Sequence, residues 1–316
     1  MRLYTIKRVE KEELAVESLT GKGLYLLEDL GFSYVDMNDF ICHVTEAEME
    51  QLKDKVHDTD AAWKRTESEA FMECVEGTEG TQASILPWNC VKICAPIPRP
   101  RQDVICLGIN YGDHALEAGK FSNEDFGGER PYTIYFSKRV NLAPGTGDKI
   151  PSYEGLVDSL DYEVELGVII GKDAKGVKPE AAGEYIFGYT VFNDVSARNL
   201  QTRHKQWYMG KSLDGFAPMG PCIVTADEIE DVQNLNVSCK VNGELRQSSN
   251  TRFMLQSVAG AIAELSAGMT LQAGTIIATG TPAGVGMGMT PPTFLKAGDE
   301  IVCEIEKIGQ LVNVVE

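Results

Sequence analysis

The chain is poor in basic residues and histidine, and it has no long apolar run. Its 316 residues include 29 Lys and Arg against 47 Asp and Glu, a formal charge of −18. A surface of that sign repels phosphate backbones and anionic lipid, so neither nucleic acid nor a membrane is expected as a partner. No apolar run approaches the roughly 18 residues of a membrane span, and the charged N-terminus has no signal-peptide core. We therefore expect a soluble, cytoplasmic protein.

Several motifs of common enzyme classes are also missing. Four histidines and the absence of a C-x-x-C pair argue against structural zinc. The eight scattered cysteines predict buried thiols in a reducing compartment and no disulfide framework. There is no G-x-S-x-G elbow of a serine hydrolase. The glycine-rich run 284–289 has methionine where the last glycine of a dinucleotide fingerprint would fall.

A proline-rich connector divides the chain. Pro96, Pro98 and Pro100 stand on alternate residues, which excludes helix and favours an extended linker. The segment before it is charged and irregular, whereas the segment after it is rich in short apolar runs. This change predicts a small N-terminal domain over 1–95 and a main domain over 96–316.

The main domain shows many short strands and few helices. Asn242-Gly243 between apolar positions predicts a hairpin, and a helix is expected over 251–266, capped by Asn250 or Thr251. No regular strand–helix alternation is present, so the pattern favours a mixed, β-rich α+β fold over a doubly wound one. Further strands are predicted over 104–107, 160–170, 185–192, 222–225, 275–279, 300–305 and 310–315, the last two as a pair.

Three carboxylates stand out against this background. Glu163 and Glu165 alternate along a predicted strand and so project from the same face. One interpretation is a wet acidic face at a sheet edge; the other is a cation between two carboxylates, whose oxygens suit Mg²⁺, Mn²⁺ or Ca²⁺. Asp194 ends another predicted strand, where an aspartate is ordinarily a cap or turn residue. Lys211 lies in a Gly/Pro-rich loop that is unremarkable by itself.

Taken together, the motifs resemble the fumarylacetoacetate hydrolase family. The resemblance covers roughly residues 103–316 and follows the family's order. It rests on Gly108–Glu117, the Glu-x-Glu of 163–165, Asn193–Gln201, Gly210–Ser212 and Ala278–Gly286. It implies a mixed β-roll for the main domain, and it implies that the protein is commonly a homodimer.

The resemblance also implies a metal centre. Glu163, Glu165 and Asp194 match the family's metal ligands, usually for Mg²⁺ or Mn²⁺, and Lys211 matches a lysine that stabilises negative charge on the substrate. A 2-oxo acid offers a carboxylate oxygen and a keto oxygen as a bidentate chelate. Because breaking the neighbouring C–C bond leaves an enolate, a metal and Lys211 would stabilise the charge that develops there.

Five more residues receive roles by the same matching. Gln201 and Thr281 match positions that contact substrate, and Lys138 matches a lysine near the ligand carboxylate. His114 and Glu117 match a pair on a mobile lid. If that segment is helical, the two share a face, and the carboxylate can orient the imidazole as a base for water.

The leading hypothesis is therefore a metal-dependent hydrolase that cleaves a C–C bond in an acylpyruvate-like 2-oxo acid. The alternatives are decarboxylation of an oxaloacetate-like acid, isomerisation of an unsaturated 2-oxo diacid, and a catalytically idle binder of the same fold. Lys205 stands where the fumarylacetoacetate enzyme has an aromatic residue, and an additional aspartate ligand of some animal members has no clear counterpart. Both departures favour a smaller or more anionic acid.

Overall fold

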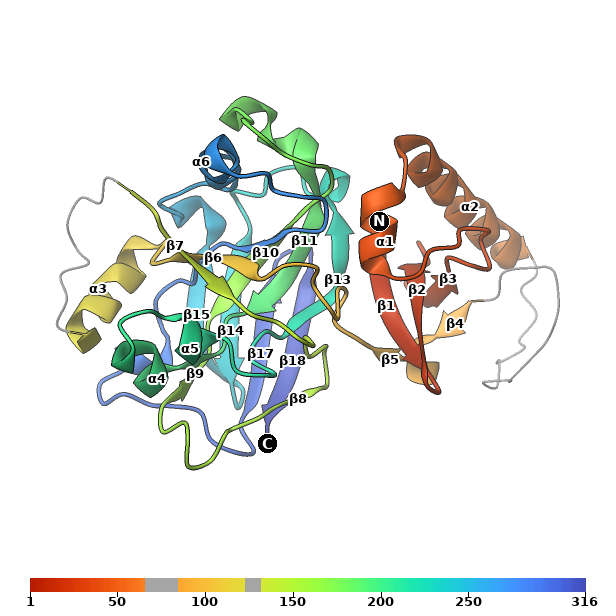
Figure 1. Cartoon of the computed structure of the whole chain (residues 1–316). Coiled ribbons are helices and arrows are strands. Elements are labelled where there is room, and N and C mark those ends of the chain that lie inside the picture. The colour runs from red at the N-terminus through yellow and green to blue at the C-terminus, as the bar shows by residue number, and fades with distance from the viewer. Residues whose placement is uncertain (66–84, 123–131) are drawn as a thin grey trace.

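One large mixed sheet runs through the molecule (Figure 1). The computed structural model describes residues 1–65, 85–122 and 132–316. All pairings in this sheet are antiparallel except that of β16 with β6. From edge to edge its strands are β4 (Leu86–Pro87), β3 (Gly23–Leu26), β2 (Lys11–Glu17), β1 (Arg2–Arg8), β13 (Met219–Thr225), β11 (Ile186–Asn193), β10 (Val164–Ile170), β16 (Ile276–Ala278), β6 (Val104–Gly108) and β7 (Ile134–Lys138), with β5 (Lys92–Ile93) paired to β1 beside this path.

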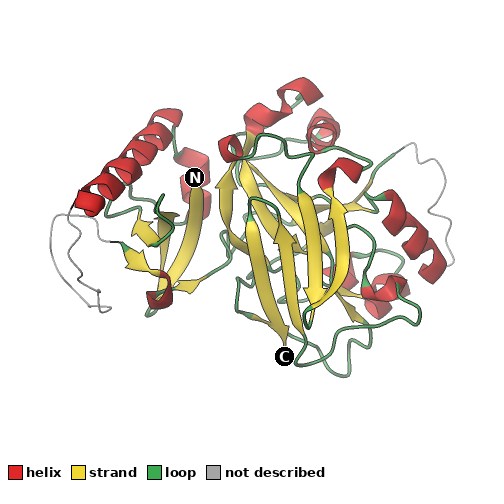
Figure 2. Cartoon of the chain, turned by 180° about the vertical axis from the view of Figure 1, so that it is seen from behind, coloured by secondary structure: helices red, strands yellow, loops and turns green. Residues whose placement is uncertain are grey.

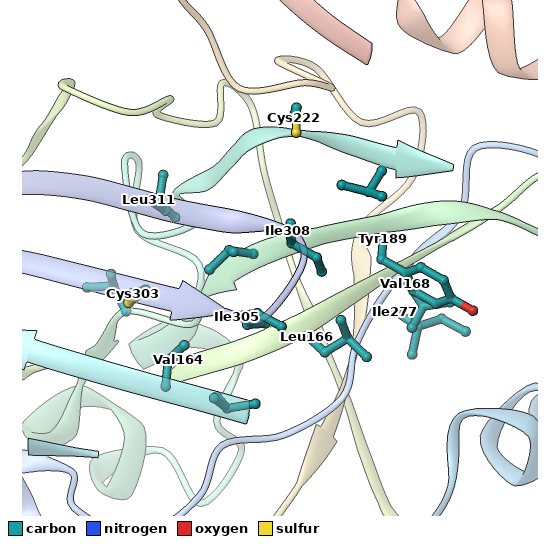
Figure 3. Packing of buried hydrophobic residues seen from close by; sticks show 14 of the residues in the cluster. Val164, Leu166, Val168, Tyr189, Cys222, Ile277, Cys303, Ile305, Ile308 and Leu311 are labelled. Carbon is teal, nitrogen blue, oxygen red and sulfur yellow. The ribbon is translucent and has the colours of Figure 1, made fainter. Parts of the chain in front are cut away.

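A second sheet packs against the first. Its strands, in order, are β15 (Glu244–Asn250), β14 (Asn236–Val241), β17 (Glu300–Ile305), β18 (Gly309–Val315) and β8 (Lys149–Ile150). The main apolar cluster fills the space between the sheets, where Val164, Leu166 and Val168 of β10 meet Cys303 and Ile305 of β17 (Figure 3). A two-stranded sheet, β9 (Leu160–Asp161) with β12 (Ser196–Ala197), lies beside the start of β10.

Helices lie around the sheets (Figure 2). They are α1 (Met37–His43), α2 (Glu46–Arg65), α3 (Gly112–Ser122), α4 (Arg198–Arg203), α5 (Tyr208–Lys211) and α6 (Val258–Gly268), with 3-10 turns η1 (Trp88–Cys90), η2 (Pro179–Tyr185), η3 (Ala226–Glu228), η4 (Thr251–Phe253) and η5 (Gly286–Gly288). None of the described helices is long and apolar enough to cross a membrane.

The predicted mixed, β-rich α+β fold is confirmed. Asn242 and Gly243 form the hairpin turn between β14 and β15, both with positive φ. β17 and β18 pair in the expected register. The main domain contains two packed sheets and few helices, as a β-roll requires.

One helix begins later than the sequence predicts. Asn250 does cap a turn, but that turn is only η4, and α6 starts at Val258 with Ser257 as its N-cap. Met254 forms a bridge to Tyr111 instead of joining the helix. This tertiary pairing overrides the local helical pattern between the two caps.

The N-terminal residues form a lobe that shares the large sheet. β1 pairs with β13, so the sheet crosses the proposed boundary at 95/96 (Figure 1). A second apolar cluster also spans it, with Phe40 and Ile41 of α1 in the same cluster as Ile169 and Phe192 of the main sheet. The division into 1–95 and 96–316 stays a prediction.

The cysteines follow the prediction with one correction. Cys106, Cys222, Cys239 and Cys303 are free and buried, and Cys42 and Cys94 are free and half-buried. Cys90 is disulfide-bonded, contrary to expectation. Cys90 ends η1 and is half-buried, and no residue of η1 is fully buried. Cys74 lies outside the described residues.

Candidate metal centre and active site

The three predicted carboxylates meet at the start of β10. One oxygen each of Glu163, Glu165 and Asp194 lies within 4.8 Å of the others. The expected strand over 160–170 is interrupted between β9 and β10. There, the main-chain amides of Tyr162 and Glu163 donate to side chains and not to a neighbouring strand. Asp161 accepts from the Tyr162 amide at 3.0 Å, and the Asn193 side-chain oxygen accepts from the Glu163 amide at 3.0 Å. β11, which pairs with β10, ends immediately before Asp194 and so delivers the third carboxylate.

All three carboxylates are buried, which excludes the simpler interpretations. Glu163, Glu165 and Asp194 are 4%, 1% and 0% exposed. β10 has neighbours on both sides, β11 and β16, and every residue in it is buried. A wet acidic sheet edge is therefore wrong. Asp194 caps no helix either, because α4 starts after Ala197 without a side-chain cap.

Two buried lysines face Asp194. Lys211, at the end of α5, donates to Glu163 Oε2 at 2.8 Å and to Asp194 Oδ2 at 2.6 Å. Lys138, at the end of β7, pairs with Asp194 Oδ1 at 2.6 Å and donates to the carbonyls of Val195 and Phe216. Lys138 thus makes two hydrogen bonds and one ion pair, while Asp194 Oδ1 has no hydrogen-bond partner among the described residues. The predicted contact of Lys138 with substrate stays a prediction.

A buried arginine completes the charge pattern. Arg198 is 2% exposed, donates from Nε to Asp161 Oδ2 at 2.9 Å and pairs through Nη1 with Glu163 Oε1 at 2.5 Å. Asp161 also accepts from the amides of Gly286 and Met287, which ties η5 to the same cluster. Arg198 thus joins the metal-ligand candidates to the glycine-rich loop.

The pKa values of Glu163 and Glu165 are shifted in opposite directions by their surroundings. Burial alone would raise the pKa of Glu163, but the charges of Lys211 and Arg198 outweigh it and hold that pKa well below its usual range. Burial, and then the charges of Asp194 and Glu163, raise the pKa of Glu165 well above its ordinary value. Burial opposes the charged form of Lys211, yet Asp194 and Glu163 raise its pKa. Among the carboxyl groups of these two glutamates, that of Glu165 is therefore the one whose ionised form the protein alone supports least.

This donor set fits a hard divalent cation. Its ligands are convergent carboxylate oxygens, which Mg²⁺ and Mn²⁺ prefer. Among the described residues, Glu165 takes part in no salt bridge and accepts only from the Gly280 amide at 2.8 Å. A buried carboxylate without a cationic partner is costly, and a bound cation would remove that cost.

The predicted lid pair lies on α3. His114 Nδ1 is 3.6 Å from Glu117 Oε2, three residues along the helix, so the two share a face as expected. His114 is 4% exposed, so its imidazole is buried in the protein. Both Glu117 oxygens accept from the Gly284 amide at 3.0 Å, so α3 is fastened to the glycine-rich loop. The catalytic roles stay predictions.

The side-chain oxygen of Gln201 and the hydroxyl of Thr281 both bond to protein groups. Gln201 Oε1 accepts from Arg198 Nη1 at 3.1 Å. The Thr281 hydroxyl donates to the Val164 carbonyl at 3.0 Å and accepts from Gln247 Nε2 at 2.8 Å. Their contacts with substrate are not tested by these bonds and stay predictions.

Sequence reasoning gave no role to Arg198, Asp161 or Gln247. A signal existed for the first two, because Arg198 is four residues after Asp194 in the quoted motif and Asp161 alternates with Glu163. Gln247 had none, since its partners are far away in the chain.

Comparisons with known proteins identify the family. The family model described as "Fumarylacetoacetate (FAA) hydrolase C-terminal" matches residues 103–316. Among curated relatives, the oxaloacetate tautomerase YisK of Bacillus subtilis (strain 168) is 49% identical over 223 residues, which are 71% of this chain and 72% of that protein.

Solved structures give the same result. The fumarylacetoacetate hydrolase from Exiguobacterium antarcticum matches with a TM-score of 0.77 and 36% identity, covering 100% of this chain and 99% of that one. The maleylpyruvate hydrolase from Sphingobium sp. SYK-6, in complex with manganese(II) and pyruvate, has a TM-score of 0.71 and 27% identity, covering 100% and 98%. The resemblance inferred from the motifs is confirmed: this chain belongs to the fumarylacetoacetate hydrolase family.

Proposed function

We propose that this protein is an oxaloacetate tautomerase, which interconverts the keto and enol forms of that 2-oxo diacid with Mg²⁺ or Mn²⁺ held by Glu163, Glu165 and Asp194. The observation that carries the proposal is the 49% identity to a protein named for this reaction, combined with the buried three-carboxylate cluster. The predicted C–C hydrolase is supported only as far as the family. The alternatives that use an enolate without water, on an oxaloacetate-like acid or by isomerisation, fit the relatives better.

The reaction moves one proton. The keto form loses a proton from C3, negative charge develops on the C2 oxygen, and that oxygen then gains a proton. A bound divalent cation would supply positive charge to the C1 carboxylate and C2 oxygens. The remaining tasks are to remove the C3 proton, to protonate the oxygen and to hold the distal carboxylate.

Hydrogen-bond accounting distinguishes the two lysines. Carboxylates engage two of the three donors of Lys211, and the third remains for a substrate oxygen. Lys138 donates instead to two main-chain carbonyls and forms an ion pair with Asp194 Oδ1. We therefore assign to Lys211 the stabilisation and protonation of the C2 oxygen, and to Lys138 the positioning of Asp194.

The other two tasks fall to His114 and Arg198. With Nδ1 of His114 facing Glu117, its Nε2 is the nitrogen that takes the C3 proton, and Glu117 favours the imidazolium that results. Arg198 Nη2 is buried and has no hydrogen-bond partner among the described residues. We assign it, next to Gln201, to the distal carboxylate of the diacid.

Hydrolysis of an acylpyruvate is the second candidate. It is favoured by the similarity to a maleylpyruvate hydrolase and by the His114–Glu117 pair, which could orient water as well as move a proton. The two reactions share the enolate and differ in whether water reaches the distal carbonyl. The deep burial of His114 favours proton transfer without water.

The test is a comparison of substrates on one preparation. Enol oxaloacetate is mixed with enzyme, and the loss of its ultraviolet absorbance is followed with Mg²⁺, with Mn²⁺ and with chelator. In parallel, pyruvate release is measured from oxaloacetate, acetylpyruvate and fumarylpyruvate. We expect metal-dependent loss of the enol without matching pyruvate release. Faster turnover of an acylpyruvate would overturn the proposal in favour of the hydrolase, and pyruvate from oxaloacetate alone in favour of a decarboxylase.

A further inference from the structure

A buried glutamine connects the two sheets directly at the metal-ligand candidates. Gln247 lies on β15 of the smaller sheet and is 0% exposed. Its Oε1 accepts from the Val164 amide at 3.0 Å, and its Nε2 donates to the Thr281 hydroxyl and to the Pro282 carbonyl, both at 2.8 Å. Val164 is the residue between Glu163 and Glu165. One amide side chain therefore reaches both the ligand strand and the loop after β16.

Thr281 closes this arrangement. Its hydroxyl accepts from Gln247 and donates to the Val164 carbonyl at 3.0 Å, so both main-chain polar groups of Val164 are bonded to the Gln247–Thr281 pair. We call this pair, with Val164, the cross-sheet clamp. The position of Val164 sets the direction in which its two glutamate neighbours point. A shift of the strand start would separate their oxygens.

The same clamp places the loop that contacts Glu165 and the lid. Gly280, one residue before Thr281, donates its amide to Glu165 Oε2 at 2.8 Å. Gly284 donates to Glu117, and it passes so close to β15 that a Cβ there would lie 1.9 Å from the Arg246 carbonyl oxygen. Gln247 therefore follows directly after Arg246, the residue of the smaller sheet that Gly284 approaches closely.

We propose that Gln247 is a positioning residue of the metal centre, acting with Thr281 to hold Glu163 and Glu165 at the spacing that a divalent cation requires. The proposal rests on the metal site of the proposed function and does not depend on which 2-oxo acid is converted. Groups that orient metal ligands through hydrogen bonds typically change metal affinity about 10- to 100-fold when they are removed. An apolar residue of similar volume would fill the space but leave the Val164 amide and the Thr281 hydroxyl without their partner.

The experiment compares Gln247→Met with a matched control. Asn313 on β18 is a second buried amide, 1% exposed, whose Nδ2 donates to the carbonyls of Gly145 and Asp148, away from the carboxylates. Asn313→Leu therefore removes a comparable pair of bonds. Thr281→Val and Thr281→Ser form a second pair, in which the serine retains the hydroxyl. Each chelator-stripped variant is titrated with Mn²⁺ alone by electron paramagnetic resonance, and its melting temperature is recorded with chelator present.

We expect Gln247→Met and Thr281→Val to raise the Kd for Mn²⁺ by at least about tenfold, and Thr281→Ser and Asn313→Leu to leave it within about twofold. The double variant Gln247→Met with Thr281→Val should weaken binding little more than either change alone, because the two residues act as a unit. If Gln247→Met does not fold, Thr281→Val against Thr281→Ser decides. Normal Mn²⁺ affinity in Thr281→Val, or equal weakening in Asn313→Leu, would overturn the proposal. Wild-type protein that binds no Mn²⁺ would overturn it together with the metal site, whereas clamp-dependent Mn²⁺ binding without tautomerase activity would refute only the proposed reaction.

Discussion

At the scale of single residues, the buried carboxylates of the site outnumber its buried cationic side chains. Four buried carboxylates, those of Asp161, Glu163, Glu165 and Asp194, meet three buried cations, Lys138, Lys211 and Arg198. Of these four carboxylates, Glu165 is the one that forms no salt bridge with a described residue. Under the proposed function, a divalent cation at this point would compensate Glu165 and supply positive charge beside the developing enolate.

Replacing Glu165 with Gln should separate metal binding from folding. The substitution keeps the shape and removes one of three neighbouring like charges, so we expect the chelator-treated variant to melt no lower than wild type. Mn²⁺ should raise the melting temperature of wild type and leave that of the variant unchanged, and metal-dependent turnover should be lost. A variant that keeps full activity or a full Mn²⁺ response would contradict the assignment of this ligand.

Replacing Arg198 with Met should destabilise the fold as well as the site. The change leaves Asp161 without its cation and Glu163 with only Lys211. Removing one partner of a buried ion pair costs about 3–5 kcal/mol, which urea unfolding can measure. As a control, Lys149→Met breaks an exposed pair with Glu316 and should cost less than about 1 kcal/mol. Similar losses for both would mean that Arg198 is not buried as described.

At the scale of elements, α3 is bonded to the loop after β16. Glu117 receives two contacts from the Gly284 amide and faces His114, so it links the lid to the loop that also serves Glu165. The position of α3 and the surroundings of Glu165 are therefore connected through one loop. Carboxylate ligands and lid need not fail together, because the contacts to Glu165 and Glu117 come from different residues of that loop.

Replacing Glu117 with Gln tests that separation. Gln keeps one acceptor for the Gly284 amide but no longer stabilises a charged His114, so kcat should fall by about 100-fold or more, in the range of acid–base contributions. The Kd for Mn²⁺ should stay within about twofold of wild type. Loss of Mn²⁺ binding would show that Glu117 supports the metal centre, and an unchanged kcat would remove the lid pair from the mechanism.

Element boundaries also show the limits of pattern reading. Strands such as β6 and β17 were predictable within a few residues because alternation and apolar runs are local. The helix expected from residue 251 was not, because the Leu255 amide bonds to the Asn110 carbonyl at 2.8 Å and Met254 pairs with Tyr111. Contacts with the segment around Asn110 and Tyr111 therefore keep residues 254 and 255 out of the helix, which begins only at Val258.

At the scale of the whole molecule, the strands of the N-terminal lobe belong to the same β-sheet as those of the main domain. Leu3 of β1 pairs with Ile223 of β13 and is 0% exposed. Apolar clusters lie on both faces of this sheet. The lobe is thus attached through a strand pairing and a core, in addition to the proline-rich connector.

Leu3→Ala should therefore weaken the entire chain. A buried leucine truncated to alanine costs about 2–5 kcal/mol, and we expect amides of β2 and of β10 to lose hydrogen-exchange protection at the same, lowered urea concentration. Val9→Ala, at a position 84% exposed, should change little. Two separate urea midpoints would instead establish 1–95 as an independent domain. The homodimer implied by the family also stays a prediction.

The sequence by itself determined the family, the β-rich class and the identity of the three carboxylates, because each of these is written in short-range spacing. Glu163 immediately precedes β10, Glu165 lies in it, and Asp194 immediately follows β11. Only the tertiary structure decided that these groups are buried and that Lys138 bonds two carbonyls whereas Lys211 bonds two carboxylates. It also decided that Gln247 bonds to Val164. Hydrogen-bond partners more than 80 residues apart leave no local pattern, since their pairing depends on how two sheets pack.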